Sequence, residues 1–388
     1  MAAAVVASSL VTILAVIPVF LLGAVAILVR QEMHFDEAAL GLSISAFFGT
    51  TALSSIPGGR LADRLGARWS LMLACTASGG ALVGIGLAAH SWATLTAFMI
   101  LGGAANGLAQ PASNLALARG VRRNRMGAAF GLKQSAIPVA NLLAGIVLPV
   151  AVLTWGWRST FVVVGCAALG VAMFAQHSVT TSGRFLQEED TKDAPIGPLL
   201  LLACGCAFGS APGIALGAFL VQSSVKSGLS PTQAGILLAL GGAVGVFSRM
   251  LSGWFADRRD GGHITVAAWM LMAGASRFAV LAVSDGHFVL VLLGTLLGFG
   301  LAWGWPGLFF LAIVRLNPNA PAAASGMSQA GGAAGGVLGP LLFGVAATRS
   351  SYTVAWTSAG VSAVLAGLLM LLGRRALLRQ RARAVPAR

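Results

Sequence analysis

Charged side chains are scarce in this sequence. Only 9% of its 388 residues are Asp, Glu, Lys or Arg, whereas 57% are hydrophobic, and the mean hydropathy is +0.86. Too few polar side chains remain to cover a water-facing surface. Stretches 5–29 and 199–221 contain no charge over a length that spans a membrane. This scarcity excludes a soluble protein and predicts an integral membrane protein.

The sequence also lacks the motifs of several kinds of reactive site. The four cysteines lie in apolar stretches without metal-ligand spacing, so we interpret them as small packing residues. There is no G-x-x-x-x-G-K-[ST] loop for ATP. None of the eleven acidic residues falls inside a predicted span, and the five histidines lie at span ends. We therefore expect no enzyme, no metal site, no cofactor and no buried carboxylate.

Long apolar blocks, by contrast, are frequent. Each is roughly 18 to 28 residues long, which at ~1.5 Å per residue crosses a ~30 Å hydrocarbon core. They begin near residues 4, 38, 69, 92, 127, 159, 196, 231, 264, 287, 323 and 353. The pattern predicts twelve membrane-spanning helices, and the 51 glycines favour close helix packing over a β-barrel.

The basic residues are distributed unevenly between the two predicted sides of the membrane. The formal net charge is +14, and 18 of the 25 Lys and Arg residues fall in segments on the side of the termini, against 4 on the other side. This is the positive-inside pattern, so the charge reports topology rather than nucleic-acid binding. We expect a bacterial-type inner membrane protein with both termini in the cytoplasm.

The chain nearly repeats itself after 194 or 195 residues. GGRLADRLG at 58–66 returns as SGWFADRRDG at 252–261, and Pro18 aligns with Pro212 in the same register. The one long polar segment between spans lies between the two copies. We predict a first six-helix bundle at 1–177, a linker at 178–197, a second bundle at 198–373 and a basic tail at 374–388. Duplicated halves with a site between them are the plan of a transporter.

These features resemble the major facilitator superfamily over essentially the whole chain. GGRLADRLGAR resembles the family's loop G-x-L-A-D-R-x-G-R-K, and it recurs weakened in the second half. The resemblance implies two pseudo-symmetric six-helix bundles around a central cavity, which rock against each other in alternating access. It also implies that Asp63 and Asp257 latch onto helices of the opposite half. The residues assigned to these signature loops are Gly59, Asp63, Arg64, Gly66, Gly253, Asp257 and Arg258.

Two of the loop glycines have a role that needs no family name. We expect Gly59 and Gly253 to permit close backbone approach where two helices meet. Matched prolines and glycines in spans one and seven predict local kinks that allow bending during gating, although simple packing kinks explain them equally well. The predicted hinge residues are Pro18, Gly23, Pro212 and Gly217.

The charges inside predicted spans are all cationic: Lys133, Arg249 and Arg277. A cation at the bilayer centre costs ~2.5 to 3.5 kcal/mol, so each requires a compensating environment. Lys133 and Arg249 lie at a similar depth, and in the family their spans face each other across the boundary between the halves. The repeat places serine opposite both, Ser328 and Ser55. We interpret them as an anion-binding pair, with snorkelling of Arg249 to the interface as the alternative, and Arg277 as structural.

Amide side chains in spans four, five and eleven are expected to help orient a ligand. The predicted binding residues are Arg249, Lys133, Gln134, Asn106, Gln110, Asn141 and Gln329. Arg249 stands in an R-x-x-x-G context that resembles monocarboxylate and oxalate transporters. Arg249 and Lys133 together favour a small organic anion, a carboxylate, as substrate.

Proton-driven drug exporters of the family differ from this chain. They place an acid inside an amino-terminal helix, an arginine where this chain has Gly103, and a G-P-x-x-G-G pattern in span five where this chain has AIPVANLLAG. Efflux of an amphiphilic drug or metabolite nevertheless stays an alternative, as does a non-transporting membrane sensor or scaffold. We expect a monomer that binds a small molecule, with or without a coupling ion.

Overall fold

The computed structural model describes residues 2–120, 126–149, 153–178, 196–258, 261–317 and 321–384. Within those ranges every regular element is a helix. The first half of the chain forms α1 (Ala2–Met33), α2 (Glu37–Ala88), α3 (Trp92–Gly120), α4 (Met126–Gln134), α5 (Ala136–Val147) and α6 (Leu153–Ser178). The second half forms α7 (Ile196–Lys226), α8 (Pro231–Arg258), α9 (His263–Ala282), α10 (Phe288–Leu316), α11 (Pro321–Arg349) and α12 (Tyr352–Ala384).

Eleven segments of the described residues are long and apolar enough to cross a membrane. Two of them, Glu37–Ala62 and Arg64–Ala88, belong to α2. This helix also bends at Gly66, whose backbone adopts φ 81° and ψ 162°. The predicted span that begins near residue 127 corresponds to α4 and α5, each too short to cross alone. The other eleven predicted spans each match a helix or, in α2, one part of it. Most of the predicted tail continues α12, which ends at Ala384, and the linker residues 179–195 lie outside the described ranges.

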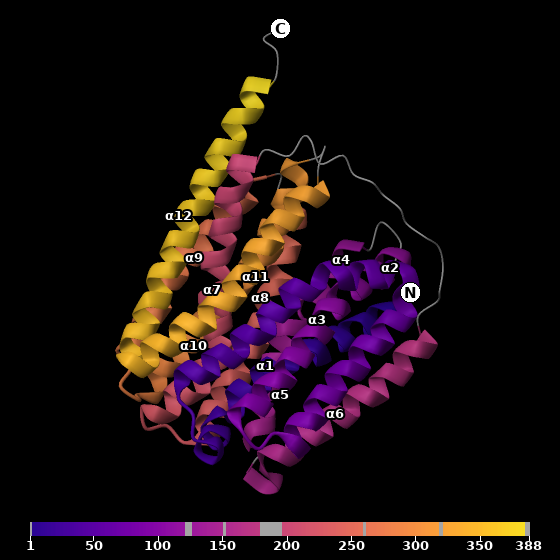
Figure 1. The fold of residues 1–388 in the computed structure, drawn as a ribbon. Coiled ribbons are helices and arrows are strands. Elements are labelled where there is room, and N and C mark those ends of the chain that lie inside the picture. The colour runs from indigo at the N-terminus through magenta and orange to yellow at the C-terminus, as the bar shows by residue number, and fades with distance from the viewer. Residues whose placement is uncertain are drawn as a thin grey trace.

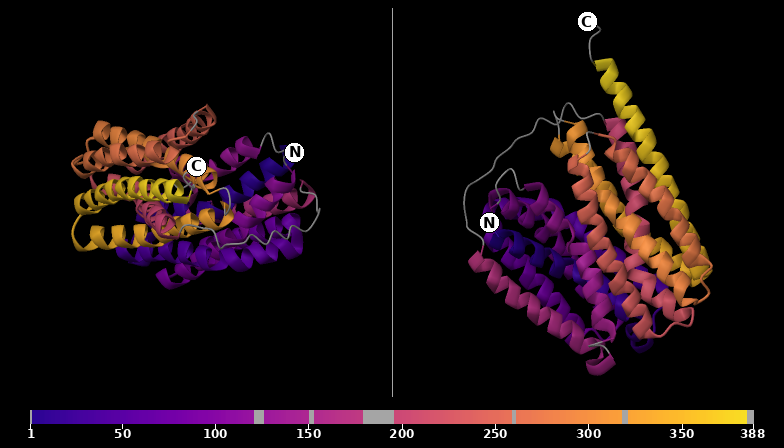
Figure 2. Two further views of the ribbon diagram at one scale, coloured as in Figure 1. Left: turned by 90° about the horizontal axis from the view of Figure 1, so that it is seen from above. Right: turned by 180° about the vertical axis from the view of Figure 1, so that it is seen from behind.

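The two halves lie side by side and are packed together at one end (Figure 1). Their ribbons diverge toward the other end, where both termini lie, and the view from behind shows the same arrangement (Figure 2). We call the divergent end the terminal side and the packed end the closed side. This arrangement separates the halves more on one side than on the other.

On the closed side, helices of opposite halves are in backbone-to-backbone contact. A Cβ on Gly41 of α2 would collide with the Pro340 carbonyl oxygen of α11, and one on Gly145 of α5 would collide with the Ala239 amide of α8. The Ala38 amide of α2 donates to Thr348 Oγ1 of α11 at 3.0 Å. Glycine is therefore required here because helices of opposite halves approach more closely than a side chain allows.

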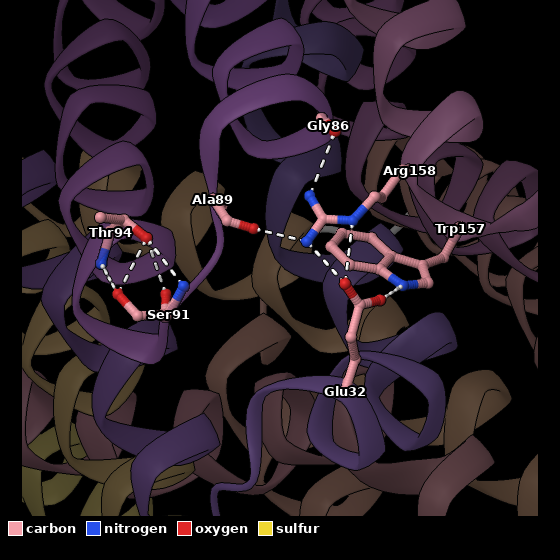
Figure 3. Close-up of polar contacts among 7 residues, drawn as sticks. All are labelled: Glu32, Gly86, Ala89, Ser91, Thr94, Trp157 and Arg158. Atoms are coloured by element: carbon pink, nitrogen blue, oxygen red, sulfur yellow. Dashed lines mark hydrogen bonds and ion pairs between the residues drawn. The ribbon is translucent and has the colours of Figure 1, made fainter.

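Two ion clusters lie on the closed side. Figure 3 shows the one inside the first half, where Arg158 of α6 donates to Glu32 at 2.7 Å and to the Ala89 carbonyl at 2.8 Å, and the Trp157 indole donates to Glu32 at 2.7 Å. This cluster ties α1, α2 and α6 together. Gly156 precedes it with φ 80°, a conformation that glycine adopts readily.

The second cluster joins the halves. Glu37, the first residue of α2, pairs with Arg30 of α1 through two contacts of 2.9 and 3.0 Å, and with Lys226 of α7 at 3.4 Å. Its side chain is only 7% exposed. The expectation of no buried carboxylate is therefore wrong, because two cations compensate this one.

One of the histidines at predicted span ends is buried. His263, the first residue of α9, is 3% exposed and lines a cavity between α8, α9 and α10.

Candidate functional site

Lys133 lies at the end of α4 with its ammonium group buried against α3. Its Nζ donates to Gln110 Oε1 at 2.7 Å and to Asn114 Oδ1 at 3.0 Å, and the residue is 3% exposed. None of the described carboxylates forms a salt bridge with it. Amide oxygens thus solvate this cation without neutralising it.

The polar contacts continue from Lys133 along α3 to α2. Gln110 Nε2 donates to Asn106 Oδ1 at 3.3 Å, and Asn106 Nδ2 donates to Thr51 Oγ1 at 3.3 Å. The Thr51 hydroxyl lies between the carbonyls of Phe47 and Gly103, at 2.9 and 3.0 Å. The structure therefore brings together three of the predicted binding residues, Lys133, Gln110 and Asn106. Thr51 was missed, because a threonine in an apolar helix carries no signal in the sequence that separates it from packing.

Arg249 lies half-buried on α8 and makes contacts to both halves. Its Nε donates to the Trp303 carbonyl of α10 at 2.9 Å, and its Nη1 donates to the Gln134 carbonyl of the first half. The guanidinium carbon stands 5.4 Å from the centre of the Trp303 ring. Gln134 follows Lys133 directly, so Arg249 contacts the first half at the residue next to Lys133.

Pro138 explains why the Gln134 carbonyl is free to accept this bond. In an unbroken helix that carbonyl would accept from the backbone N–H of residue 138, which proline lacks. The interruption between α4 and α5, at Ser135, falls in the turn that Pro138 disrupts. Pro138 thus leaves the Gln134 carbonyl, next to Lys133, without its helical donor. Arg249 donates a hydrogen bond to this carbonyl instead.

Two predicted amides lie outside this cluster. Asn141 is fully buried on α5, about 12 Å along the helix from Lys133 at ~1.5 Å per residue. Its Nδ2 donates to the Ile137 carbonyl at 3.2 Å, while its Oδ1 lacks a partner among the described residues. Gln329 is exposed on α11. The Gln134 side chain is half-buried, and its backbone carbonyl rather than its amide makes the contact to Arg249.

Arg277 is fully buried on α9, away from the cluster. Its guanidinium carbon lies 4.2 Å from the centre of the Phe278 ring, and none of its three nitrogens has a hydrogen-bond partner in the described part of the chain. The stacked pair Phe278 and Trp356 lies beside it. These aromatic contacts agree with the structural role expected from the sequence.

A cavity of about 580 Å³ lies between α8, α9 and α10. It is lined mainly by apolar side chains, among them Phe247, Leu251 and Leu297, which are large exposed hydrophobics. A second cavity of about 270 Å³ lies between α7, α11 and α12. None of the predicted binding residues lines either cavity.

In the signature loops, the glycine that allows close backbone approach is not one of the two expected. A Cβ on Gly59 would meet its nearest neighbour at 3.9 Å, and one on Gly253 would meet nothing within 4 Å. The expected close approach at these two positions is wrong, because Gly253 is exposed and Gly58 is the residue that faces a backbone: a Cβ there would stand 2.9 Å from the Gly107 carbonyl oxygen. Arg64 is exposed. The side chains of Asp63, Asp257 and Arg258 lie outside what the structure describes, so the latch stays a prediction.

The predicted hinge residues lie in unbroken helices. Pro18 and Pro212 are buried within α1 and α7, neither of which contains a residue with non-helical backbone angles. Gly23 and Gly217 serve close packing, since a Cβ on Gly23 would lie 2.5 Å from the Ala218 carbonyl and one on Gly217 would lie 2.6 Å from Asn141 Oδ1. Bending at these positions stays a prediction.

Two packed halves of six predicted spans each, with polar groups where they meet, define a helical multi-pass membrane protein of the transporter fold. The family model of the Major Facilitator Superfamily matches residues 8–284 and 213–387. The chain therefore belongs to the major facilitator superfamily, as its signature loop indicated. The fold and family are those of transporters rather than of enzymes.

Solved structures agree on the fold. A bacterial homologue of the human lysosomal transporter Spinster, in an inward-facing and occupied conformation, matches with a TM-score of 0.73 and 18% identity, covering 99% of this chain and 98% of that one. A D-xylose–proton symporter matches with a TM-score of 0.76 and 16% identity, covering 95% and 96%.

Curated relatives match over different lengths. An MFS-type efflux pump of Mycolicibacterium smegmatis is 27% identical over 341 residues, 82% of this chain and 77% of the pump. The probable sulfoacetate transporter SauU of Cupriavidus necator is 31% identical over 143 residues, 37% of this chain and 33% of SauU. The human voltage-gated purine nucleotide uniporter SLC17A9 is 28% identical over 135 residues, 34% and 31%. The matched stretch thus spans about a third of the length of the last two relatives.

Proposed function

We propose that this protein is a secondary transporter that carries a small organic anion across the membrane by alternating access. One observation carries the proposal. Arg249 of the second half contacts Gln134, the residue next to Lys133 of the first half, and no described carboxylate pairs with either cation. Two cations held without an acid form a site of positive potential, which favours an anion.

Both cations retain donors for a ligand. Lys133 has three N–H donors and gives two to Gln110 and Asn114, and Arg249 has five and gives two to backbone carbonyls in the described structure. A carboxylate that accepts from them would form charge-assisted bonds, which are stronger than bonds between neutral groups. The half-buried Gln110 adds an amide beside Lys133.

The relatives support the same substrate class. SauU is named for sulfoacetate and SLC17A9 for purine nucleotides, and both substrates are organic anions. The excess of basic residues on the terminal side supports a cytoplasmic location for both termini in a bacterial-type inner membrane. With that topology, the divergent terminal side opens toward the cytoplasm. We propose a monomer, with or without a coupling ion.

Binding to the purified protein tests the proposal. Sulfoacetate, lactate and oxalate are titrated by calorimetry into the unmodified protein and into Arg249→Ala and Lys133→Ala. We expect at least one of the three anions to bind, and each variant to weaken that binding about tenfold or more, since a hydrogen bond to a charged group contributes ~1.5 to 3 kcal/mol. Arg375→Ala removes an exposed cation of α12 as the matched control and should bind normally. Unchanged affinity in both site variants would contradict the proposal.

Efflux of an amphiphilic compound is the second candidate function. It is favoured by the efflux pump of M. smegmatis, the relative above that covers most of this chain. Flux measurements in proteoliposomes separate the candidates: anion uptake that Arg249→Ala abolishes supports the first, and export of a hydrophobic dye without anion flux supports the second. Absence of flux for both would favour the non-transporting sensor or scaffold.

A further inference from the structure

Arg249 makes its contact to the first half through a backbone carbonyl that Pro138 leaves without a helical partner. We propose that the Gln134 carbonyl is a built-in competitor for the substrate, so that an anion binding to Arg249 displaces it and releases α8 from the first half. Pro138 is then a positioning residue for substrate affinity and for the coupling of binding to movement. This inference rests on the proposed function, because it needs an anion that binds to Arg249.

The geometry of the guanidinium limits how an anion can bind. The Nε atom is committed to the Trp303 carbonyl at 2.9 Å, and Trp303 belongs to the same half as Arg249. The edge formed by the two terminal nitrogens is therefore the one available for a carboxylate to engage through two bonds. The Gln134 carbonyl already accepts from Nη1 on that edge. Carboxylate and carbonyl thus compete for the same nitrogen.

The internal repeat supports a link between Pro138 and Arg249. At the established offsets, Arg249 aligns with Ser55 of α2, and Pro138 aligns with Ala333 of α11. Ser55 donates within its own helix, to the Thr51 carbonyl at 2.6 Å, and α11 continues unbroken through Ala333. At the aligned positions the counterpart contact α2–α11 therefore has neither the proline nor the arginine that α5–α8 has.

The surroundings of Pro138 make a clean substitution possible. Pro138 is buried, and its Cβ lies 3.0 Å from where a Cβ on Gly245 of α8 would stand. Alanine keeps the Cβ that faces α8 but restores the backbone N–H, so Pro138→Ala gives the Gln134 carbonyl an intrahelical partner. The substitution removes the competitor while it leaves Arg249 and the packing at Gly245 in place.

The experiment compares anion affinity in three proteins. Whichever of sulfoacetate, lactate or oxalate binds the unmodified protein is titrated into Pro138→Ala and into Pro57→Ala, a control that removes an exposed proline from inside α2. We expect Pro138→Ala to bind the anion about 3- to 10-fold more tightly, a change that corresponds to losing one competing hydrogen bond, and Pro57→Ala to bind it as the unmodified protein does.

A second readout separates competition from a merely structural effect. In the unmodified protein, saturating anion should increase amide hydrogen exchange in α8 around Arg249, because the bond to the first half is lost. In Pro138→Ala, exchange there should be raised already and should not respond to the anion. If the unmodified protein binds an anion but Pro138→Ala neither gains affinity nor loses this response, the inference is wrong while the proposed function stands. If none of the probe anions binds the unmodified protein, the proposed function itself fails.

Discussion

Lys226 of α7 reaches across the boundary between the halves to Glu37 of α2, with its Nζ 3.4 Å from Oε1. The carboxylate is 7% exposed while the lysine side chain is 61% exposed, so the carboxylate is the buried partner. Arg30 of α1 holds the same carboxylate from its own half. Arg30 thus holds the Glu37 carboxylate in place on the closed side, where Lys226 of the second half pairs with it.

Replacing that carboxylate should loosen the closed side. We expect Glu37→Gln to lower the free energy of unfolding by about 1 to 3 kcal/mol, because Arg30 loses the anion that compensates its burial. Hydrogen exchange should rise at the start of α2 and the end of α7. Glu32→Gln is the control, since Glu32 pairs with Arg158 inside one half. It should affect α1 and α6 and leave α7 unchanged; equal exchange at α7 in both variants would contradict the role of Glu37.

Adding one methyl group to Gly41 should oppose closure. A Cβ there collides with the Pro340 carbonyl oxygen, so the helices must separate, at a cost of about 1 to 3 kcal/mol to the closed arrangement. Spin labels near the closed-side ends of α2 and α11 should report a larger distance in Gly41→Ala. Gly49→Ala is a control on the same helix, because its Cβ would meet Val337 at an ordinary 3.8 Å. A distance that does not change in Gly41→Ala would exclude α2–α11 as a point of closure.

The Lys133 cluster predicts non-additive energetics. We expect Gln110→Leu to destabilise the protein by about 1 to 3 kcal/mol, because the buried ammonium loses its 2.7 Å acceptor. In a double variant with Lys133→Met the same leucine should cost much less, since no ammonium remains to be solvated. Denaturant unfolding of the single and double variants measures the difference. The control Gln329→Leu, at an exposed position on α11, should leave the free energy of unfolding nearly unchanged. Additive effects of Gln110→Leu and Lys133→Met would show that the two side chains do not interact.

The signature loop predicts opposite effects at two neighbouring glycines. Gly66 adopts φ 81° and ψ 162°, a region nearly restricted to glycine, so Gly66→Ala should destabilise by about 1 to 3 kcal/mol. Gly59 is helical and has space for a Cβ, so Gly59→Ala should be neutral or stabilise by up to ~1 kcal/mol. Thermal unfolding measures the stability of the two variants. Equal melting temperatures for Gly66→Ala and Gly59→Ala would contradict the prediction.

The fold could be predicted from the sequence because membrane helices must satisfy their own backbone and expose apolar side chains. Eleven of twelve apolar blocks become single spans for this reason. The fifth block instead forms two short helices, because Pro138 interrupts it. In the sequence, AIPVANLLAG stands out only because it departs from a pattern of the family's drug exporters. The consequence of Pro138, a free carbonyl at Gln134, depends on which residue of the other half stands opposite, and the sequence does not place Arg249 to that accuracy.

The candidate site was predicted in part for a similar reason. Lys133, Gln110 and Asn106 come together because helical spacing and depth in the span are readable from the sequence. Asn141 shares a helix with Pro138 but lies too deep to reach Lys133. Glu37, like the other acidic residues, was expected outside the spans. Asp36 instead caps α2 by accepting from the Ala39 amide at 2.8 Å, which makes Glu37 the first residue of this helix.

The two half-to-half contacts, α5–α8 and α2–α11, differ in a way that bears on inhibition. At α2–α11 the Ser45 hydroxyl donates to the Val337 carbonyl at 2.6 Å beside the close approach at Gly41, so this bond between the halves joins two uncharged groups. At α5–α8 a guanidinium and a backbone acceptor face each other across the boundary. A small molecule with a carboxylate for Arg249 and an N–H for the Gln134 carbonyl would bridge the halves instead of parting them. Such a compound should bind without being carried, and so act as a transport blocker selective for chains with this proline and arginine.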